Sequence, residues 1–423
     1  MTPAEGCIPL RTSQLKSSRN SRAFPNESPA VSSYALGHRS VVMRWGTYFA
    51  VLSSVLSVGL ALGVSMPLVS LRLEAWGYGA FAIGVMAAMP AMGVLLGASL
   101  ASRLAAVLGT ANVMRLCLWG GAVSVGLLAV LPDYWIWLVL RLMLGVILTM
   151  VFILGESWIN QLVTENLRGK LVALYGSCYA LSQLGGPLLL GAIGTEADYG
   201  FWIGTALLAI SPLLLLGRTG APSAESSHVS LRDLGGFCRK LPAIAWAIAL
   251  FAGFEAMILT LLPVYCLQQG FTPEIALAMV STVVVGDALL QLPIGALADR
   301  ISRRRLFSGC ALVLTSSSVA IALLVNTVAI WPLWVLFGAS AGGLFTLSLI
   351  LIGERYRDDA LVRANAHVAQ LWGIGCLLGP LAAGAGSQWI SGQALPILMA
   401  AGALGLVIVS QRPRAFGVQP ATA

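Results

Sequence analysis

Three ionisable side chains stand inside long apolar stretches of the chain, where they can do chemistry that surface charges cannot. Arg141, Glu255 and Asp287 each lie several residues inside such a stretch. Ionisable groups are costly to bury in a membrane and commonly mark a substrate or proton pathway. A carboxyl group at that depth can take up and release protons, so we predict a role in proton coupling. A structural hydrogen bond, and for Arg141 extension to the membrane surface, are the alternatives.

The composition provides the helices that would position these groups. Of 423 residues, 58% are hydrophobic and only 10% are charged. A helix that crosses a bilayer needs about 20 apolar residues. The apolar runs predict an all-α membrane protein with twelve transmembrane helices. They lie at about 46–71, 79–101, 111–131, 135–160, 171–194, 201–217, 243–267, 273–298, 306–326, 332–353, 363–388 and 394–410.

The charges predict how these helices are oriented. If the N-terminus is cytoplasmic, all 25 Lys and Arg residues except Arg72 and Arg141 fall in cytoplasmic tails, loops or helix ends. This is the positive-inside pattern, so we expect both termini in the cytoplasm and the protein in the cell (inner) membrane. The net charge of +8 flanks apolar helices, which favours a lipid bilayer over nucleic acid as the partner.

A weak internal repeat divides the helices into two halves. Gly145 matches Gly343, and Gly155-Glu156 matches Gly353-Glu354 in the same order along the chain. Such a repeat predicts two homologous halves in parallel orientation, as in transporters that work between similar halves. The expected parts are a disordered tail at 1–44, a six-helix bundle at 45–217, a cytoplasmic linker at 218–242, a second bundle at 243–410 and a cytoplasmic tail at 411–423. Met43 is an alternative start of translation.

The loop after the eighth span carries a more specific pattern. The sequence GALADRISRR, which begins at Gly295, resembles the loop motif GxLaDrxGrk of the major facilitator superfamily. The resemblance implies the major facilitator fold, with two pseudo-symmetric six-helix bundles, and a cytoplasmic gate. Its candidate residues here are Gly295, Asp299, Arg300, Arg303 and Arg304. An Asp at a helix end can bind a neighbouring helix terminus, whereas a plain positive-inside loop is the alternative. The first half has Ala101 in place of Asp299.

Two helix motifs extend the resemblance. Arg141 and Gly145 match the superfamily's RxxxG pattern, and its helices four and seven line a central cavity. This implies that Arg141 and Glu255 face that cavity and interact across the halves. Small residues and prolines in the fifth and eleventh spans resemble an antiporter motif that favours export. They are candidates for helix packing and kinks, with ordinary close packing as the alternative: Gly186, Pro187, Gly191, Gly375, Gly379, Pro380 and Gly384.

The junction between the fourth and fifth spans resembles the YcaD-like branch of the superfamily. Its sequence is GESWIN, which contains Glu156, followed after a few residues by ENLRGK, which contains Arg168. A Glu156–Arg168 pair would join the cytoplasmic ends of two helices, and Glu354 repeats the acid in the second half. Solvated charges are the alternative, since exposed pairs contribute little stability.

These features predict a secondary active transporter that works by alternating access, with proton-coupled efflux of a small amphipathic solute. Uptake of a sugar, organic acid or other metabolite is the alternative, as is a membrane sensor or scaffold without transport. We expect a monomer that is not an enzyme and has no cofactor. The seven Cys and three His residues are dispersed without metal-ligand spacing, and a phosphate-binding loop is absent. Gln183, Gln291 and Gln370 could line a cavity.

Overall fold

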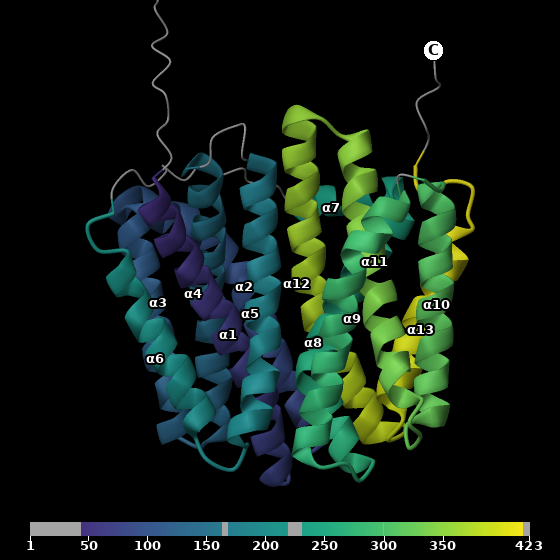
Figure 1. Cartoon of the computed structure of the whole chain (residues 1–423), viewed down its shortest axis with the longest axis horizontal. Helices are drawn as coiled ribbons and strands as arrows, with labels where there is room; N and C mark the ends of the chain where they lie inside the picture. Colours follow the sequence, from purple (N-terminus) through teal and green to yellow (C-terminus); the bar gives the residue numbers. More distant parts are fainter. Residues whose placement is uncertain (1–43, 163–167, 219–230, 299, 418–423) are drawn as a thin grey trace, which may run out of the picture. The chain divides into compact units, whose positions relative to one another are not determined.

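The computed structural model describes residues 44–162, 168–218, 231–298 and 300–417, within one compact unit, Val42–Ala423. In these residues every regular element is a helix (Figure 1). The predicted N-terminal tail and Met43 lie outside the described residues, apart from Arg44. The expected all-α membrane fold is confirmed by these helices and by the comparisons given below.

The helices follow the apolar runs of the sequence. The N-terminal bundle comprises α1 (Trp45–Ala75), α2 (Ala80–Leu108), α3 (Thr110–Val130), α4 (Tyr134–Leu162), α5 (Arg168–Ile193) and α6 (Tyr199–Leu214). The C-terminal bundle comprises α8 (Pro242–Gln268), α9 (Pro273–Ala298), α10 (Arg303–Leu324), α11 (Ile330–Arg355), α12 (Asp358–Trp389) and α13 (Ala394–Ser410). Each predicted span overlaps one of these helices. Within the described residues, nine spans are long and apolar enough to cross a membrane, and three apolar helices are shorter.

One helix was not predicted. The short α7 (Leu231–Lys240) falls in the polar segment between the bundles and packs on α8 and α12. Its buried residues Leu234 and Phe237 belong to a small apolar cluster that also contains Leu241. Spacing of three and four residues places these side chains on one face of a helix. The segment therefore covers the end of the C-terminal bundle, although its overall composition is polar.

The two faces of the molecule can be named from the chain direction. We call the face at which α1 begins and α13 ends the termini face, and the other the opposite face (Figure 1). Because successive helices are antiparallel, α2 and α9 begin at the opposite face and α12 ends there. The bundles meet through α2 against α12, α5 against α9 and α1 against α8. These pairs position everything that lies between the bundles.

Glycine allows the closest helix contacts, and two of these contacts are alike in the two bundles. In the N-terminal bundle a methyl group on Gly186 of α5 would overlap the backbone of Gly63 on α1. In the C-terminal bundle a methyl group on Gly379 of α12 would lie 2.7 Å from the Cα of Gly253 on α8. Small residues permit such close backbone approach in membranes. Gly191 differs, because a methyl group there would meet nothing within 4 Å.

The remaining small residues have various neighbours. Methyl groups placed on Gly145, Gly375 and Gly384 would crowd the backbones of α2, α8 and α2, respectively. The Gly384 contact joins the two bundles, because a methyl group there would lie 2.6 Å from the carbonyl oxygen of Ala80. Pro187 and Pro380 lie inside α5 and α12, where each removes a backbone hydrogen bond.

Arg141 lies in the core of the N-terminal bundle. Its side chain is fully buried, and Nε, Nη1 and Nη2 have no hydrogen-bond partner among the described residues. One turn earlier on α4, the Trp137 ring packs against Trp76 and Phe201 at 4.7 and 5.8 Å between centroids. Leu144, on the same buried face, is also in this core. The guanidinium group therefore carries a large desolvation cost without protein contacts that offset it.

The glycine contact predicts a difference between two substitutions on α5. Gly186→Ala should lower the free energy of unfolding by about 1–3 kcal/mol, because the added methyl group forces α1 and α5 apart. Gly191→Ala is the matched control and should be neutral or slightly stabilising, since Ala favours helix more than Gly does. Thermal unfolding of both variants in detergent, followed by tryptophan fluorescence, measures the difference. Equal unfolding temperatures would contradict the close contact.

The buried guanidinium predicts a stabilising substitution. Arg141→Met should raise the free energy of unfolding by roughly 1–4 kcal/mol, because an apolar side chain of similar length avoids the desolvation cost. The unfolding temperature should rise accordingly. Arg115→Met on α3 is the control, since Arg115 donates a hydrogen bond to the carbonyl oxygen of Ala111 at 3.3 Å and should lose stability slightly. A lower unfolding temperature for Arg141→Met would show that this cation stabilises the bundle.

Candidate functional site

Glu255 lies near the middle of α8, between the two bundles. It is about 20 Å from the termini-face end of its helix, at 1.5 Å per residue. The side-chain amide of Gln183, on α5 of the other bundle, donates a hydrogen bond to its carboxylate. Asp287 of α9 is close enough for its charge to act on Glu255. A carboxylate largely removed from water needs hydrogen bonds, and the half-buried Glu255 receives one from a residue of the opposite bundle.

Glu255 and Asp287 line the same small cavity. Its volume is about 40 Å³, and its other lining side chains, from α8, α9 and α11, are apolar. This volume has room for one or two water molecules, which need polar partners such as these two carboxyl groups. Two carboxylates in so small an apolar space repel each other. A proton bound to either one removes that repulsion.

Side chains from two further positions approach Glu255. Tyr179 of α5 and Cys376 of α12 both lie close enough to interact electrostatically with it. The Cys376 thiol also donates a hydrogen bond to the carbonyl oxygen of Ala252 at 3.4 Å. Helices α5, α8, α9 and α12 therefore converge on one carboxyl group. Tyr179 is one turn from Gln183, so both lie on the same face of α5.

The structure joins some predicted site residues and separates others. Glu255 and Asp287, predicted only by their depth, lie together, and Gln183 is one of the glutamines expected to line a cavity. The predicted contact between Arg141 and Glu255 is absent from the described part of the structure, because Arg141 has no hydrogen-bond partner there. Its side chain is fully buried, one turn from Trp137, whose ring packs against Trp76 and Phe201 of the same bundle. Tyr179 and Cys376 were not predicted.

At the termini face, two predicted gate residues form an ion pair. Arg303 at the start of α10 pairs with Glu354 at the end of α11. Both side chains are partly exposed, and both belong to the C-terminal bundle. The Arg304 guanidinium lies over the Phe416 ring, 5.4 Å from its centroid, and Arg300 is exposed.

For the other gate candidates, the described residues show no contact between predicted partners. Glu156 is exposed near the end of α4, where its backbone carbonyl oxygen accepts a hydrogen bond from Asn160 at 3.0 Å. Asp299 and the side chain of Arg168 lie outside the described residues, so the predicted Glu156–Arg168 pair stays a prediction. A methyl group on Gly295 would meet nothing within 4 Å.

At the opposite face, contacts join the bundles. The Gln388 side chain of α12 accepts a hydrogen bond from the backbone N–H of Phe81 on α2 at 3.3 Å. The adjacent Trp389 ring packs on Phe81 with 4.7 Å between centroids. Between α8 and α1, the Gln268 amide donates a hydrogen bond to the Glu74 carboxylate at 3.4 Å. The bundles are therefore in contact from this face to the level of Glu255.

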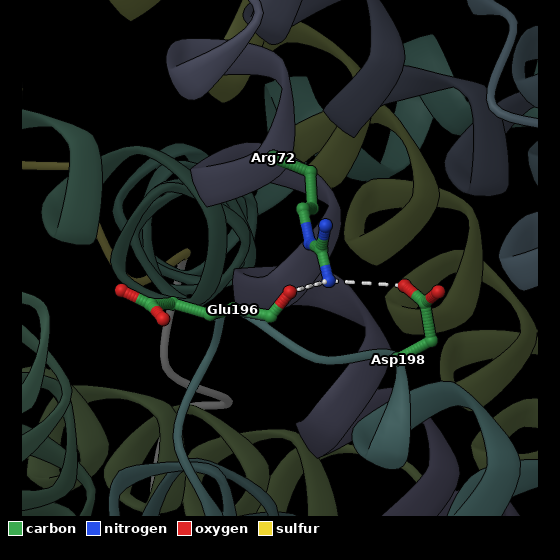
Figure 2. A network of polar contacts seen from close by, with 3 residues as sticks. All are labelled: Arg72, Glu196 and Asp198. Atoms are coloured by element: carbon green, nitrogen blue, oxygen red, sulfur yellow. Dashed lines mark hydrogen bonds and ion pairs between the residues drawn. The ribbon is translucent and has the colours of Figure 1, made fainter.

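A polar network braces the same face of the N-terminal bundle. Figure 2 shows the Arg72 guanidinium between the backbone of Glu196 and the carboxylate of Asp198. Arg72 donates hydrogen bonds to the Glu196 carbonyl oxygen at 2.6 Å and to Asp198 at 3.0 Å. This network ties the end of α1 to the connection between α5 and α6. It explains why an arginine lies at this face, which was an exception to the charge pattern of the sequence.

Comparisons with known proteins agree with this architecture. A family model described as Major Facilitator Superfamily matches residues 49–286 and 270–417. The "Uncharacterized MFS-type transporter YfkF" of Bacillus subtilis (strain 168) is 23% identical over 347 residues, 80% of this chain and 88% of that protein. The corresponding YcaD of Escherichia coli O9:H4 (strain HS) is 25% identical over 332 residues, 78% of this chain and 86% of that protein.

A solved structure supports the fold independently of sequence. The nucleoside transporter NupG matches with a TM-score of 0.68 at 16% identity, covering 87% of this chain and 98% of its own. The predicted resemblance to this superfamily and to YcaD is thus confirmed. The chain belongs to the Major Facilitator Superfamily and is a multi-pass membrane transporter of small molecules.

Proposed function

We propose that this transporter is driven by protons and exports a small organic solute by alternating access. The observation that carries the proposal is the hydrogen bond between Gln183 and Glu255, which joins the two bundles at mid-membrane depth beside Asp287. In alternating access the bundles move apart on one side and together on the other. A proton-binding group held between them is placed to sense that movement.

The chemistry of the carboxyl pair supports coupling. A charged Glu255 accepts the hydrogen bond from Gln183, whereas a protonated Glu255 can donate one instead. Protonation also relieves the repulsion from Asp287. Each change alters the free energy of bringing α5 against α8 and α9. Proton binding can shift the equilibrium between conformations only through such a difference.

The contacts between the bundles support a direction of opening. Among the described residues, those at the opposite face are glycine packing at Gly384, a ring pair at Phe81, and two hydrogen bonds, one accepted by the Gln388 amide and one donated by the Gln268 amide. Contacts of this kind can break and re-form without separating a buried ion pair. We infer that the transporter is closed at the opposite face and opens its site at the termini face.

The termini face is proposed to be cytoplasmic, in the cell membrane. Its arginines, among them Arg300, Arg355 and Arg412, support this through the positive-inside rule. The same rule supports the divisions expected from the sequence: bundles at 45–217 and 243–410, joined by a cytoplasmic segment at 218–242. We propose that a single copy of the chain is sufficient, because each chain holds both bundles and the carboxyl pair.

The charged residues at the termini face are proposed to have different roles in the two bundles. Arg303 and Glu354 hold the ends of α10 and α11 together, so that the two helices move as one unit. Counting from Gly97 and Gly295 along the repeat, Arg303 corresponds to Ala105, so Glu156 lacks this partner in the first half. Asp299 remains the proposed gate residue of the C-terminal bundle. Export rather than uptake rests on the resemblance of α5 and α12 to the antiporter motif.

The coupling proposal predicts the behaviour of Glu255→Gln in proteoliposomes. Screened against cations, sugars, nucleosides and organic acids, the wild-type protein should move protons with at least one compound. Glu255→Gln should reduce that flux at least about tenfold, equivalent to 1.4 kcal/mol, because the amide cannot exchange a proton. Asp287→Asn should reduce it too.

The matched control is Glu274→Gln, which removes an exposed acid at the start of α9 and should leave the flux unchanged. If no compound moves protons through the wild-type protein, or if Glu255→Gln retains full flux, the coupling proposal is wrong.

The ion pair at the termini face predicts a charge-swap result. Arg303→Glu and Glu354→Arg should each lower thermal stability slightly, by about 0.2–1 kcal/mol, as expected for a partly exposed pair. The double variant should recover most of the loss, because the charges are again opposite. A double variant less stable than either single variant would show that the pair does not join α10 to α11.

A further inference from the structure

Three aromatic side chains form a cluster in the C-terminal bundle. Phe251 of α8 stacks on Phe345 of α11 at 4.9 Å between ring centroids. Trp372 of α12 packs edge-on against both, at 5.5 Å from Phe251 and 5.2 Å from Phe345. All three are half-buried, so part of each ring remains accessible.

A second aromatic cluster lies in the N-terminal bundle. Phe152 of α4 packs against Tyr179 of α5 at 5.2 Å and against Tyr175 at 6.3 Å between centroids. Phe152 and Tyr179 are also half-buried, whereas Tyr175 is buried. Spacing of four residues places Tyr175, Tyr179 and Gln183 on one face of α5. This is the face that reaches Glu255 in the other bundle.

The two clusters lie at the same depth. At 1.5 Å per residue, Phe251 and Tyr179 are about 14 and 17 Å from the termini-face ends of their helices, and Phe152 is about 15 Å from its own. Glu255 is one turn deeper than Phe251 on the same face of α8. Trp372 stands one turn from Cys376 in the same way. Tyr179 and Phe251 therefore both neighbour Glu255, one from each bundle.

The charged groups beside these rings are acids. Glu156 lies close enough to Tyr175 to interact electrostatically, and Glu255 does the same with Tyr179. Asp287 stands behind Glu255 in the adjoining cavity. Arg141, the buried cation of α4, lies about 17 Å along the helix from Phe152, toward the opposite face. Rings with acids at both ends attract positive charge, because the face of an aromatic ring is electronegative.

We propose that these rings, together with Glu255 and Asp287, bind an organic cation with an apolar, aromatic body. The rings would contact the apolar body of the ligand, and their faces would also contact its cationic group. The carboxylates of Glu255 and Asp287 would neutralise that positive charge. An anion of the same shape would be repelled by both acids, and a neutral compound would gain only the apolar contacts. The proposal names a substrate class for the proposed transport function and rests on it.

Binding of three probes of similar shape tests the proposal directly. Tetraphenylphosphonium, tetraphenylborate and triphenylphosphine oxide carry positive, negative and no net charge. Purified wild-type protein should be stabilised against thermal unfolding by the cation, because a ligand of the folded state raises the unfolding temperature by mass action. Its affinity should exceed that for the neutral compound at least about tenfold. The anion should bind more weakly still.

Variants locate the binding site. Phe251→Leu and Phe345→Leu should each weaken cation binding several-fold while keeping an apolar side chain, and Glu255→Gln should reduce the preference for the cation over the neutral probe. Phe49→Leu is the matched control, since Phe49 is an exposed ring on α1 that stacks on Trp45 and should have no effect. If a variant fails to fold, the charge preference of the wild-type protein still decides the question.

Failure of this proposal can be told apart from failure of the proposed function. Equal affinity for the cation and the anion, or binding unaffected by Phe251→Leu and Phe345→Leu, would overturn the cation site. Proton-coupled flux of an uncharged compound, with no cation binding, would overturn the cation site and leave the transport function intact. Tight cation binding by a protein that moves no protons would support the cation site and contradict the proposed proton coupling.

Discussion

A carboxylate between two bundles needs a hydrogen-bond partner or a proton, and Glu255 takes its partner from the other bundle. The cost of leaving it unpaired in a low-dielectric space is large, so its charge and its contact with Gln183 are linked. That link is the constraint on which the proposed mechanism depends. The cavity shared with Asp287, the convergence of α5, α8, α9 and α12, and one aromatic cluster from each bundle all lie next to this one group.

The scaffold and the chemistry follow different rules of symmetry. Close contacts of α5 on α1 and of α12 on α8 both include a glycine pair, Gly186 with Gly63 and Gly379 with Gly253. The buried charge of Arg141 has no such twin. Arg141 is buried without a described partner in one bundle, and the corresponding position in the other is Ala339. In the proposed mechanism, symmetric packing would let both bundles move alike, and the asymmetric charges would make only one bundle respond to protons.

The sequence predicted the positions of helices and of buried acids along the membrane normal. It did not predict the direction in which side chains point around each helix axis. Apolar length alone predicts where a helix crosses a membrane, so every predicted span matched a helix, and the depths of Glu255 and Asp287 followed. Which way a side chain points around a buried, all-apolar helix is set by packing against neighbours. The partner of Glu255 was therefore Gln183 rather than Arg141, which is fully buried without a hydrogen bond from the described residues. Helix α7 was missed because its few apolar residues lie in a polar segment.

The central claim is that the protonation of Glu255 sets the contact between the bundles. Spin labels at the exposed positions Tyr78 and Ile390, one on each bundle at the opposite face, report that contact as a distance distribution. In a cysteine-free background, the distribution of the protein with native Glu255 should shift between short and long distances as the pH changes. Glu255→Gln should hold one distribution at every pH. If the distance distribution of Glu255→Gln shifted with pH as much as that of the protein with native Glu255, the account would be contradicted.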